Sequence, residues 1–200
     1  MRRAGPSLHV GKGVIVYAPL SPSALTYDKT GANQLRNLTR AAAEAIGLEW
    51  KESAALVLRR GPYLIAAGLD EGMPDKPPVV LNGRYISLFD PALAVVNAVA
   101  LIPGSRAMLL DVATATAEKE GILAAACGVR EESVTADAIS FRAFGVAGSN
   151  AVVCIASRRA PKTVTVGGIL LASANWHFDS GLLWLRFQNS PEPVAIEVKR

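Results

Sequence analysis

After Trp50 the chain is a series of short apolar runs separated by turn-forming residues, and this pattern limits the folds open to it more than any other feature. The turn signals are Gly61-Pro62, Asn82-Gly83, Asp90-Pro91, Pro103-Gly104, Gly148-Ser149-Asn150, Gly167-Gly168 and Ser180-Gly181. The expected strands cover residues 55–59, 63–69, 79–81, 85–89, 94–102, 107–112, 122–127, 133–144, 151–156, 163–166, 169–178, 182–187 and 194–198. Many short strands at near-regular spacing are typical of antiparallel sandwiches. The expected fold class is therefore mainly β.

The first fifty residues have a different pattern. Val14–Ala18 is a continuous apolar run, as expected of a strand buried on both faces in a parallel sheet. Residues 32–46 are predicted to form a helix, with Thr30 as its N-cap and Gly47 after its last turn. The apolar stripe of this helix consists of Leu35, Leu38, Ala42 and Ile46.

Three parts of the chain follow from these patterns. We expect a strand–helix segment over 1–50, a small antiparallel β domain over 51–113 and a β-sandwich over 114–200. A single sandwich over 51–200 is the alternative. The stretch 113–120 is the best candidate for a linker, and a short helix near 113–121 is the one helical pattern that the sequence offers after Trp50.

Composition excludes several classes of protein. The 200 residues are 50% hydrophobic and 19% charged, which is enough apolar material for a core and too much for a disordered chain. The net charge is +4, and the basic excess is not gathered into the stripe that nucleic-acid binding needs. No apolar run reaches the roughly 18 residues of a membrane span, and no apolar stretch of a signal peptide follows Met1-Arg2-Arg3. We expect no nucleic-acid or membrane partner and, by default, a cytoplasmic location.

The sequence carries no signature of a metal, a cofactor or a disulfide framework. Cys127 and Cys154 are too few for a zinc site, and we interpret them as two small buried hydrophobic residues. A bridge between them stays open as an alternative if strands place them side by side. No phosphate loop, Gly-x-Ser-x-Gly elbow or His-Glu-x-x-His motif is present.

Catalytic residues are not predicted. His9 and His177 are the only histidines, and no spacing supports a triad built on either of them. Asp70 and Glu71 are the best carboxylate pair for sugar hydrolysis, but neighbouring strand residues point to opposite faces unless the chain bends. We interpret this pair as part of a solvated turn.

The last predicted hairpin makes a geometric prediction. If Ser180-Gly181 is a two-residue turn, the pairs Phe178–Leu183, Trp176–Leu185 and Ala174–Phe187 share one face and form a core. The opposite face then carries the pairs His177–Trp184 and Asn175–Arg186.

This opposite face is the candidate ligand site. Trp184 offers a flat ring on which the C–H face of a sugar can stack, and Arg186, Asn175 and His177 offer hydrogen-bonding groups beside it. The alternative is that another strand, loop or domain covers Trp184, with Arg186 lying over its ring.

Several segments resemble parts of known glycosidases. Residues 11–17, a loop and a helix ending in Ala45-Ile46-Gly47-Leu48 resemble the last strand and helix of the glutamine-amidotransferase-like, or flavodoxin-like, domain in family 42 β-galactosidases and related glycoside hydrolases. Segments 56–67, 86–90 and 101–110 are similar to the small C-terminal β domain of these enzymes. Segments 162–168, 182–187 and 194–198 resemble the terminal β-sandwich of many glycosidases. The resemblance rests on strand patterns with glycine and proline punctuation rather than on signature motifs.

The resemblance implies an accessory role. The barrel that carries the acid and nucleophile glutamates of the family has no counterpart in these residues, so no catalytic residue is carried over. We therefore expect a non-catalytic carbohydrate-associated module, similar to the C-terminal region of a bacterial glycoside hydrolase, with an upstream catalytic domain as a partner. The first alternative is a structural or homo-oligomeric module without a ligand, suggested by the unpaired strand Val14–Ala18. The second is a small glycoside hydrolase that uses Asp70 or Glu71.

Overall fold

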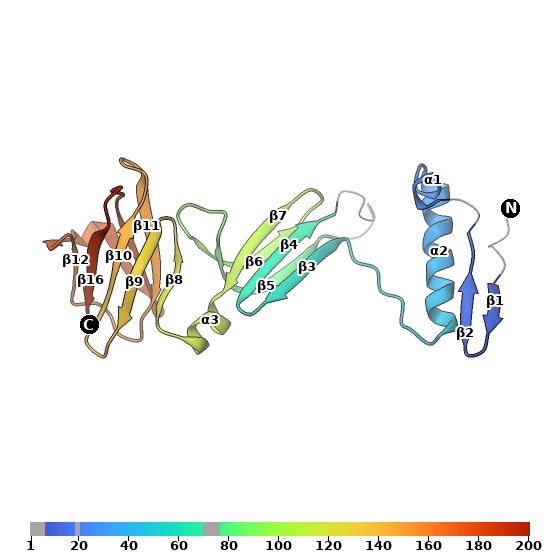
Figure 1. The fold of residues 1–200 in the computed structure, drawn as a ribbon, viewed down its shortest axis with the longest axis horizontal. Coiled ribbons are helices and arrows are strands. Elements are labelled where there is room, and N and C mark those ends of the chain that lie inside the picture. The colour runs from blue at the N-terminus through green and yellow to red at the C-terminus, as the bar shows by residue number, and fades with distance from the viewer. Residues whose placement is uncertain (1–6, 19–20, 70–76) are drawn as a thin grey trace. The chain divides into compact units, whose positions relative to one another are not determined.

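The computed structural model describes residues 7–18, 21–69 and 77–200, and its contacts divide the chain into two units, Met1–Glu52 and Ser53–Arg200. In the first unit, strand β1 (Ser7–Val10) pairs antiparallel with β2 (Gly13–Val16), and the helices α1 (Pro22–Leu25) and α2 (Lys29–Ala45) follow (Figure 1).

The long helix is confirmed, with a different start. Asp28 is the N-cap, and its carboxylate accepts a hydrogen bond of 2.7 Å from the backbone N–H of Gly31. Thr30, the predicted cap, lies inside the first turn instead. Gly47 follows the helix at a φ of +76°, a conformation that glycine adopts without the steric cost other residues incur.

The expected environment of the first strand is wrong. Val14–Ala18 was expected to lie buried on both faces of a parallel sheet, but β2 belongs to a two-stranded antiparallel hairpin and Ile15 is 55% exposed. The physical reason is Gly11, which at a φ of +60° closes a tight turn between two short runs.

The second unit begins with a five-stranded sheet in the order β3-β4-β7-β5-β6, in which all neighbours are antiparallel (Figure 1). Its strands are β3 (Ala55–Arg60), β4 (Tyr63–Gly68), β5 (Val79–Ser87), β6 (Val95–Leu101) and β7 (Arg106–Asp111). One face of this sheet carries buried apolar side chains that pack against one another, among them Leu64, Tyr85 and Leu109.

Strand β5 contains a bulge where the sequence indicated a turn. Asn82-Gly83 was expected to separate two strands, yet the chain continues through it and the register shifts between Asn82 and Tyr85. Gly83 has a φ of +152°, and the hydroxyl of the buried Tyr85 donates a 2.9 Å hydrogen bond to the carbonyl oxygen of Asn82. A glycine and a polar neighbour satisfy a bulge as well as a turn, which explains the error.

Two further sheets complete the mainly β fold. One has the order β13-β12-β16-β10-β9 and the other β14-β15-β11-β8, and their facing apolar sides share a core that includes Ile139, Val153 and Leu185. Their strands are β8 (Gly121–Ala125), β9 (Gly128–Val134), β10 (Ala138–Phe144), β11 (Asn150–Ala156), β12 (Thr163–Val166), β13 (Ile169–Leu170), β14 (Trp176–Asp179), β15 (Leu182–Gln188) and β16 (Val194–Lys199). The prediction of a mainly β, antiparallel fold is thus confirmed.

Two expected strands are each divided. The run 133–144 contains the end of β9, a turn at Thr135–Asp137 and β10, and the run 169–178 contains β13, a short 3-10 helix over Ser173–Asn175 and β14. The stretch 113–120 lies mostly within helix α3 (Val112–Glu118), which Asp111 caps by accepting a hydrogen bond from the backbone N–H of Thr114.

A second apolar cluster joins the five-stranded sheet that begins with β3 to the sheet β14-β15-β11-β8. Ile86, Leu93 and Leu110 pack there with Cys154 and Trp184 from the outer face of β11 and β15. Both sheets therefore bury apolar side chains that would otherwise be open to water.

Replacing Gly83 with alanine should destabilise the second unit by about 2–4 kcal/mol, because the backbone is strained for an L residue and the new Cβ would lie 2.6 Å from the Tyr85 hydroxyl. Urea unfolding followed by far-UV circular dichroism measures the loss. Gly148→Ala is the control and should cost about 1 kcal/mol, since Gly148 has a φ of +74° and, apart from its chain neighbours, no atom of the described residues lies within 4 Å of its Cβ position. Equal losses would show that the bulge tolerates the methyl group.

Candidate functional site

The hairpin β14–β15 positions the predicted ligand residues. Ser180 and Gly181 both have positive φ, at 48° and 81°, as a two-residue hairpin turn requires. The resulting register pairs Phe178 with Leu183 and Trp176 with Leu185 on the core face, and it confirms these two predicted pairs.

The outer face agrees with the prediction only near the turn. His177 pairs with Trp184 as expected, but β14 begins at Trp176, so Ala174 and Asn175 lie in the 3-10 helix and make no strand pairs with Phe187 and Arg186. The backbone N–H of Asn175 donates to the carbonyl oxygen of Ala172 instead of to a strand.

Trp184 is not an open stacking platform. Only 8% of the residue is exposed, and it belongs to the apolar cluster between the sheets. Its indole Nε1–H donates a 3.1 Å hydrogen bond to the carbonyl oxygen of Leu93. The prediction that a sugar stacks on this ring is therefore corrected, and the covered alternative describes the ring.

The other predicted residues do not form a single site with the Trp184 ring. His177 is exposed and its ring stacks with that of Trp184, at 6.0 Å between ring centroids and 26° between planes. Arg186 is exposed, and within the described residues no cation–π contact joins it to Trp184.

Two of the predicted residues, Asn175 and Arg186, meet at one surface hollow. It has a volume of about 520 Å³, and Pro91 from the loop after β5 also lines it. Asn150 and Gln188 lie opposite each other on β11 and β15, and the Gln188 side-chain amide donates a 2.9 Å hydrogen bond to Asn150 Oδ1. The hollow thus gathers three amide side chains and one guanidinium.

Asn150 and Gln188 were not predicted as site residues. The alternation Trp184, Arg186, Gln188 along β15 would have placed Gln188 on the outer face. Asn150 could not be found in this way, because its place depends on the pairing of β11 with β15, which are distant in sequence.

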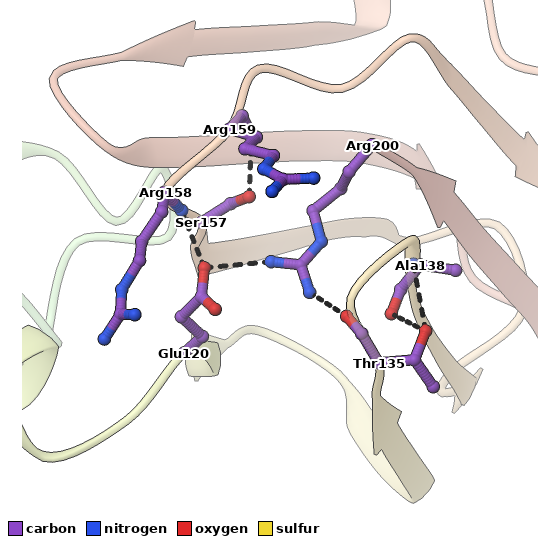
Figure 2. A network of polar contacts seen from close by, with 7 residues as sticks. All are labelled: Glu120, Thr135, Ala138, Ser157, Arg158, Arg159 and Arg200. Carbon is purple, nitrogen blue, oxygen red and sulfur yellow. Dashed lines mark hydrogen bonds and ion pairs between the residues drawn. The ribbon is translucent and has the colours of Figure 1, made fainter.

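A charged network lies elsewhere on the same unit (Figure 2). Glu120 Oε1 accepts hydrogen bonds from the backbone N–H of Arg158, at 2.7 Å, and from Arg200 Nη1, at 2.9 Å. The Arg200 side chain is only 3% exposed, and its Nη2 donates to the carbonyl oxygen of Thr135. Glu120 is therefore the centre of this network.

This network is structural rather than a ligand site. The hydrogen bond from the Arg158 N–H holds the pKa of Glu120 below its usual value, burial opposes that shift, and the positive charge of Arg200 supports it. The adjacent hollow of about 330 Å³ is lined by Arg158, Arg159 and Arg200, but Glu120 lies in the same wall and its charge disfavours an anion.

The cysteines are both free. Cys154 lies fully buried between the sheets, where burial raises the pKa of its thiol to about 12, and Cys127 is half-buried. The interpretation of both as apolar packing residues agrees with this placement.

The described residues contain no cluster of His, Cys, Asp and Glu side chains that could hold a metal ion. None of the helices of the described chain is long and apolar enough to cross a membrane. Asp70 and Glu71, the carboxylates considered for hydrolysis, lie outside the described residues, as does the side chain of His9.

No family model matches the chain, and no curated protein or solved structure is significantly similar to it. The resemblance to family 42 β-galactosidases therefore stays a prediction.

Trp184→Phe should destabilise the second unit by about 1–3 kcal/mol, because it keeps most of the ring but leaves the buried Leu93 carbonyl oxygen without its donor. Trp176→Phe, on the same hairpin, is the matched control, since no hydrogen bond of its ring N–H occurs among the described residues. Chemical unfolding of both variants measures the difference. Equal losses would mean that the indole hydrogen bond contributes nothing.

Glu120→Gln should lower the free energy of unfolding at pH 7 by about 1–3 kcal/mol, since it removes the charge that the buried Arg200 guanidinium faces. Because the folded-state pKa of Glu120 is lowered, its contribution is present above the unfolded-state pKa and is lost as the pH falls through the folded-state value. Unfolding of both proteins at pH 7 and pH 3 should show the difference shrinking in acid.

The matched control for Glu120→Gln is Glu131→Gln, which removes an exposed pair with Arg142 and should cost less than about 1 kcal/mol. A pH-independent difference between Glu120→Gln and the parent would contradict the proposed electrostatic role.

Proposed function

We propose that this chain is a non-catalytic, carbohydrate-associated module that contacts sugar through the hollow lined by Asn175, Arg186, Asn150 and Gln188. The observation that carries the proposal is the convergence of three amides and one guanidinium, drawn from β11, β15 and the 3-10 helix before β14, on one open surface.

The chemistry of these groups suits sugar hydroxyls. A side-chain amide presents a donor and an acceptor in one plane, and an arginine presents several donors, so adjacent hydroxyls of a pyranose can be bound in pairs. The hollow is open rather than enclosed, which favours a stretch of polysaccharide over a small, fully buried ligand. Trp184 lies on the same strand, β15, in the buried apolar cluster beside the hollow, and it does not itself contact the ligand.

The test is native affinity electrophoresis through gels that contain soluble polysaccharides: a β-galactan, an arabinogalactan, a xylan and a β-glucan. The parent protein should be slowed by at least one polymer. The double variant Asn175→Ala/Arg186→Ala should bind that polymer at least about tenfold more weakly, because two hydrogen-bonding side chains are lost.

Arg142→Ala is the matched control, since it removes an exposed arginine of the same charge from β10, on the other sheet of the sandwich, and should leave the retardation unchanged. Free migration of the parent in every gel, or equal retardation of the parent and the double variant, would overturn the proposal.

A structural module that associates with itself is the second candidate function. The observation that favours it is an apolar face of the first sheet that is left open at β3 and β4, where Leu56 is 65%, Leu58 50% and Ile65 48% exposed. Contiguous apolar surface of this kind is typical of interaction sites. The strand that first suggested the idea, Val14–Ala18, already has a partner in β1.

A further inference from the structure

Strand β3 lies at one edge of the five-stranded sheet, and among the described strands β4 is its only neighbour (Figure 1). Every residue of β3 after Ala55 is exposed, and its first four residues, Ala55–Leu58, are all apolar. An exposed, apolar edge strand is a template for pairing with another strand.

The hydrogen bonds of neighbouring residues show which backbone groups face away from β4. The N–H of Leu69 donates to the carbonyl oxygen of Ala54, so Ala54 faces β4. In an antiparallel ladder alternate residues direct both of their groups to the same side. Leu56 and Leu58 therefore also face β4, whereas Ala55, Val57 and Arg59 direct their N–H and C=O groups toward the open edge.

One of these three outward residues is already satisfied. Ser53 Oγ donates to the carbonyl oxygen of Ala55, at 2.9 Å, and accepts from the N–H of Ala55, at 3.1 Å. Within the described residues, the outward groups of Val57 and Arg59 have no backbone partner. The edge thus offers a short, defined set of donors and acceptors, bounded on one side by Ser53.

We propose that β3 pairs antiparallel with β3 of a second copy of this chain, about a two-fold axis at Leu58. In this register the outward groups of Val57 exchange hydrogen bonds with those of Arg59 in the second copy, and the reverse pair follows by symmetry. Leu58 lies opposite Leu58 of the second copy, and the two sheets continue into one another. The inference rests on the second candidate function, self-association.

The charges select this register over its neighbours. It places Arg59 opposite Val57 and Arg60 opposite Leu56 of the second copy, so no two arginines lie directly opposite each other. A shift by one pair toward the C-terminus would set Arg59 opposite Arg59 of the second copy, which is unfavourable. A shift the other way would require Ala55 to give up its bonds to Ser53.

The first experiment measures self-association of the full chain by sedimentation velocity over a range of concentrations. The parent should form a dimer. Val57→Pro should weaken it at least about tenfold, because the proline removes an outward donor and leaves the bonds between β3 and β4 intact. Far-UV circular dichroism and the unfolding midpoint check that Val57→Pro still folds.

The second experiment tests the register by cross-linking. In a Cys127→Ser background, Leu58→Cys should form a covalent dimer under mild oxidation, since non-hydrogen-bonded residues directly opposite each other have Cβ atoms about 4.5–5.5 Å apart. Ile65→Cys is the matched control: Ile65 is as exposed, lies beside Leu58 on β4, and is one strand further from the axis on each copy.

The outcomes separate the two claims. A monomer at all concentrations would overturn both the edge pairing and the second candidate function. A dimer that survives Val57→Pro, or that cross-links equally through Ile65→Cys, would overturn the edge pairing alone. Retardation in polysaccharide gels is measured independently of either result.

Discussion

The architecture of the second unit depends on the burial of Trp184 against the loop that follows β5. Its indole N–H binds the carbonyl oxygen of Leu93, a buried residue held at a φ of +51°, which costs a non-glycine residue about 1–2 kcal/mol. Burial of Leu93 and its hydrogen bond to Trp184 offset that strain. Without this contact, the first sheet and the outer face of β11–β15 would each expose apolar surface.

The same contact divides the outer face of β11–β15 into two parts. Cys154 and Trp184 are covered, while Asn150, Arg186 and Gln188 stay open. The loop that supplies Leu93 also supplies Pro91 to the wall of the hollow. The packing that removes the aromatic platform therefore shapes the polar surface beside it, so the proposed ligand site and the core between the sheets are parts of one arrangement.

Much of the β structure could be predicted from local sequence, because strand period and turn chemistry act over a few residues. The hairpin at Ser180-Gly181 shows this, since its turn fixes the pairing of His177 with Trp184. Asn82-Gly83 marks the limit, because a turn and a bulge make the same demand on glycine. Of the candidate site, Asn175 and Arg186 could be predicted from the hairpin pattern. The burial of Trp184 could not, because Leu93 lies 91 residues earlier in the sequence, and neither could Asn150, which lies on the distant strand β11.

Cys154 shows a consequence of the close packing between the sheets. Its thiol is fully buried and, with a pKa of about 12, stays protonated at neutral pH, so an alkylating reagent can reach it only when the two layers part. Its rate of labelling consequently counts the transient openings of that core. The chain thus carries its own reporter thiol where its two β layers meet, and the labelling of that thiol shows how often the layers separate.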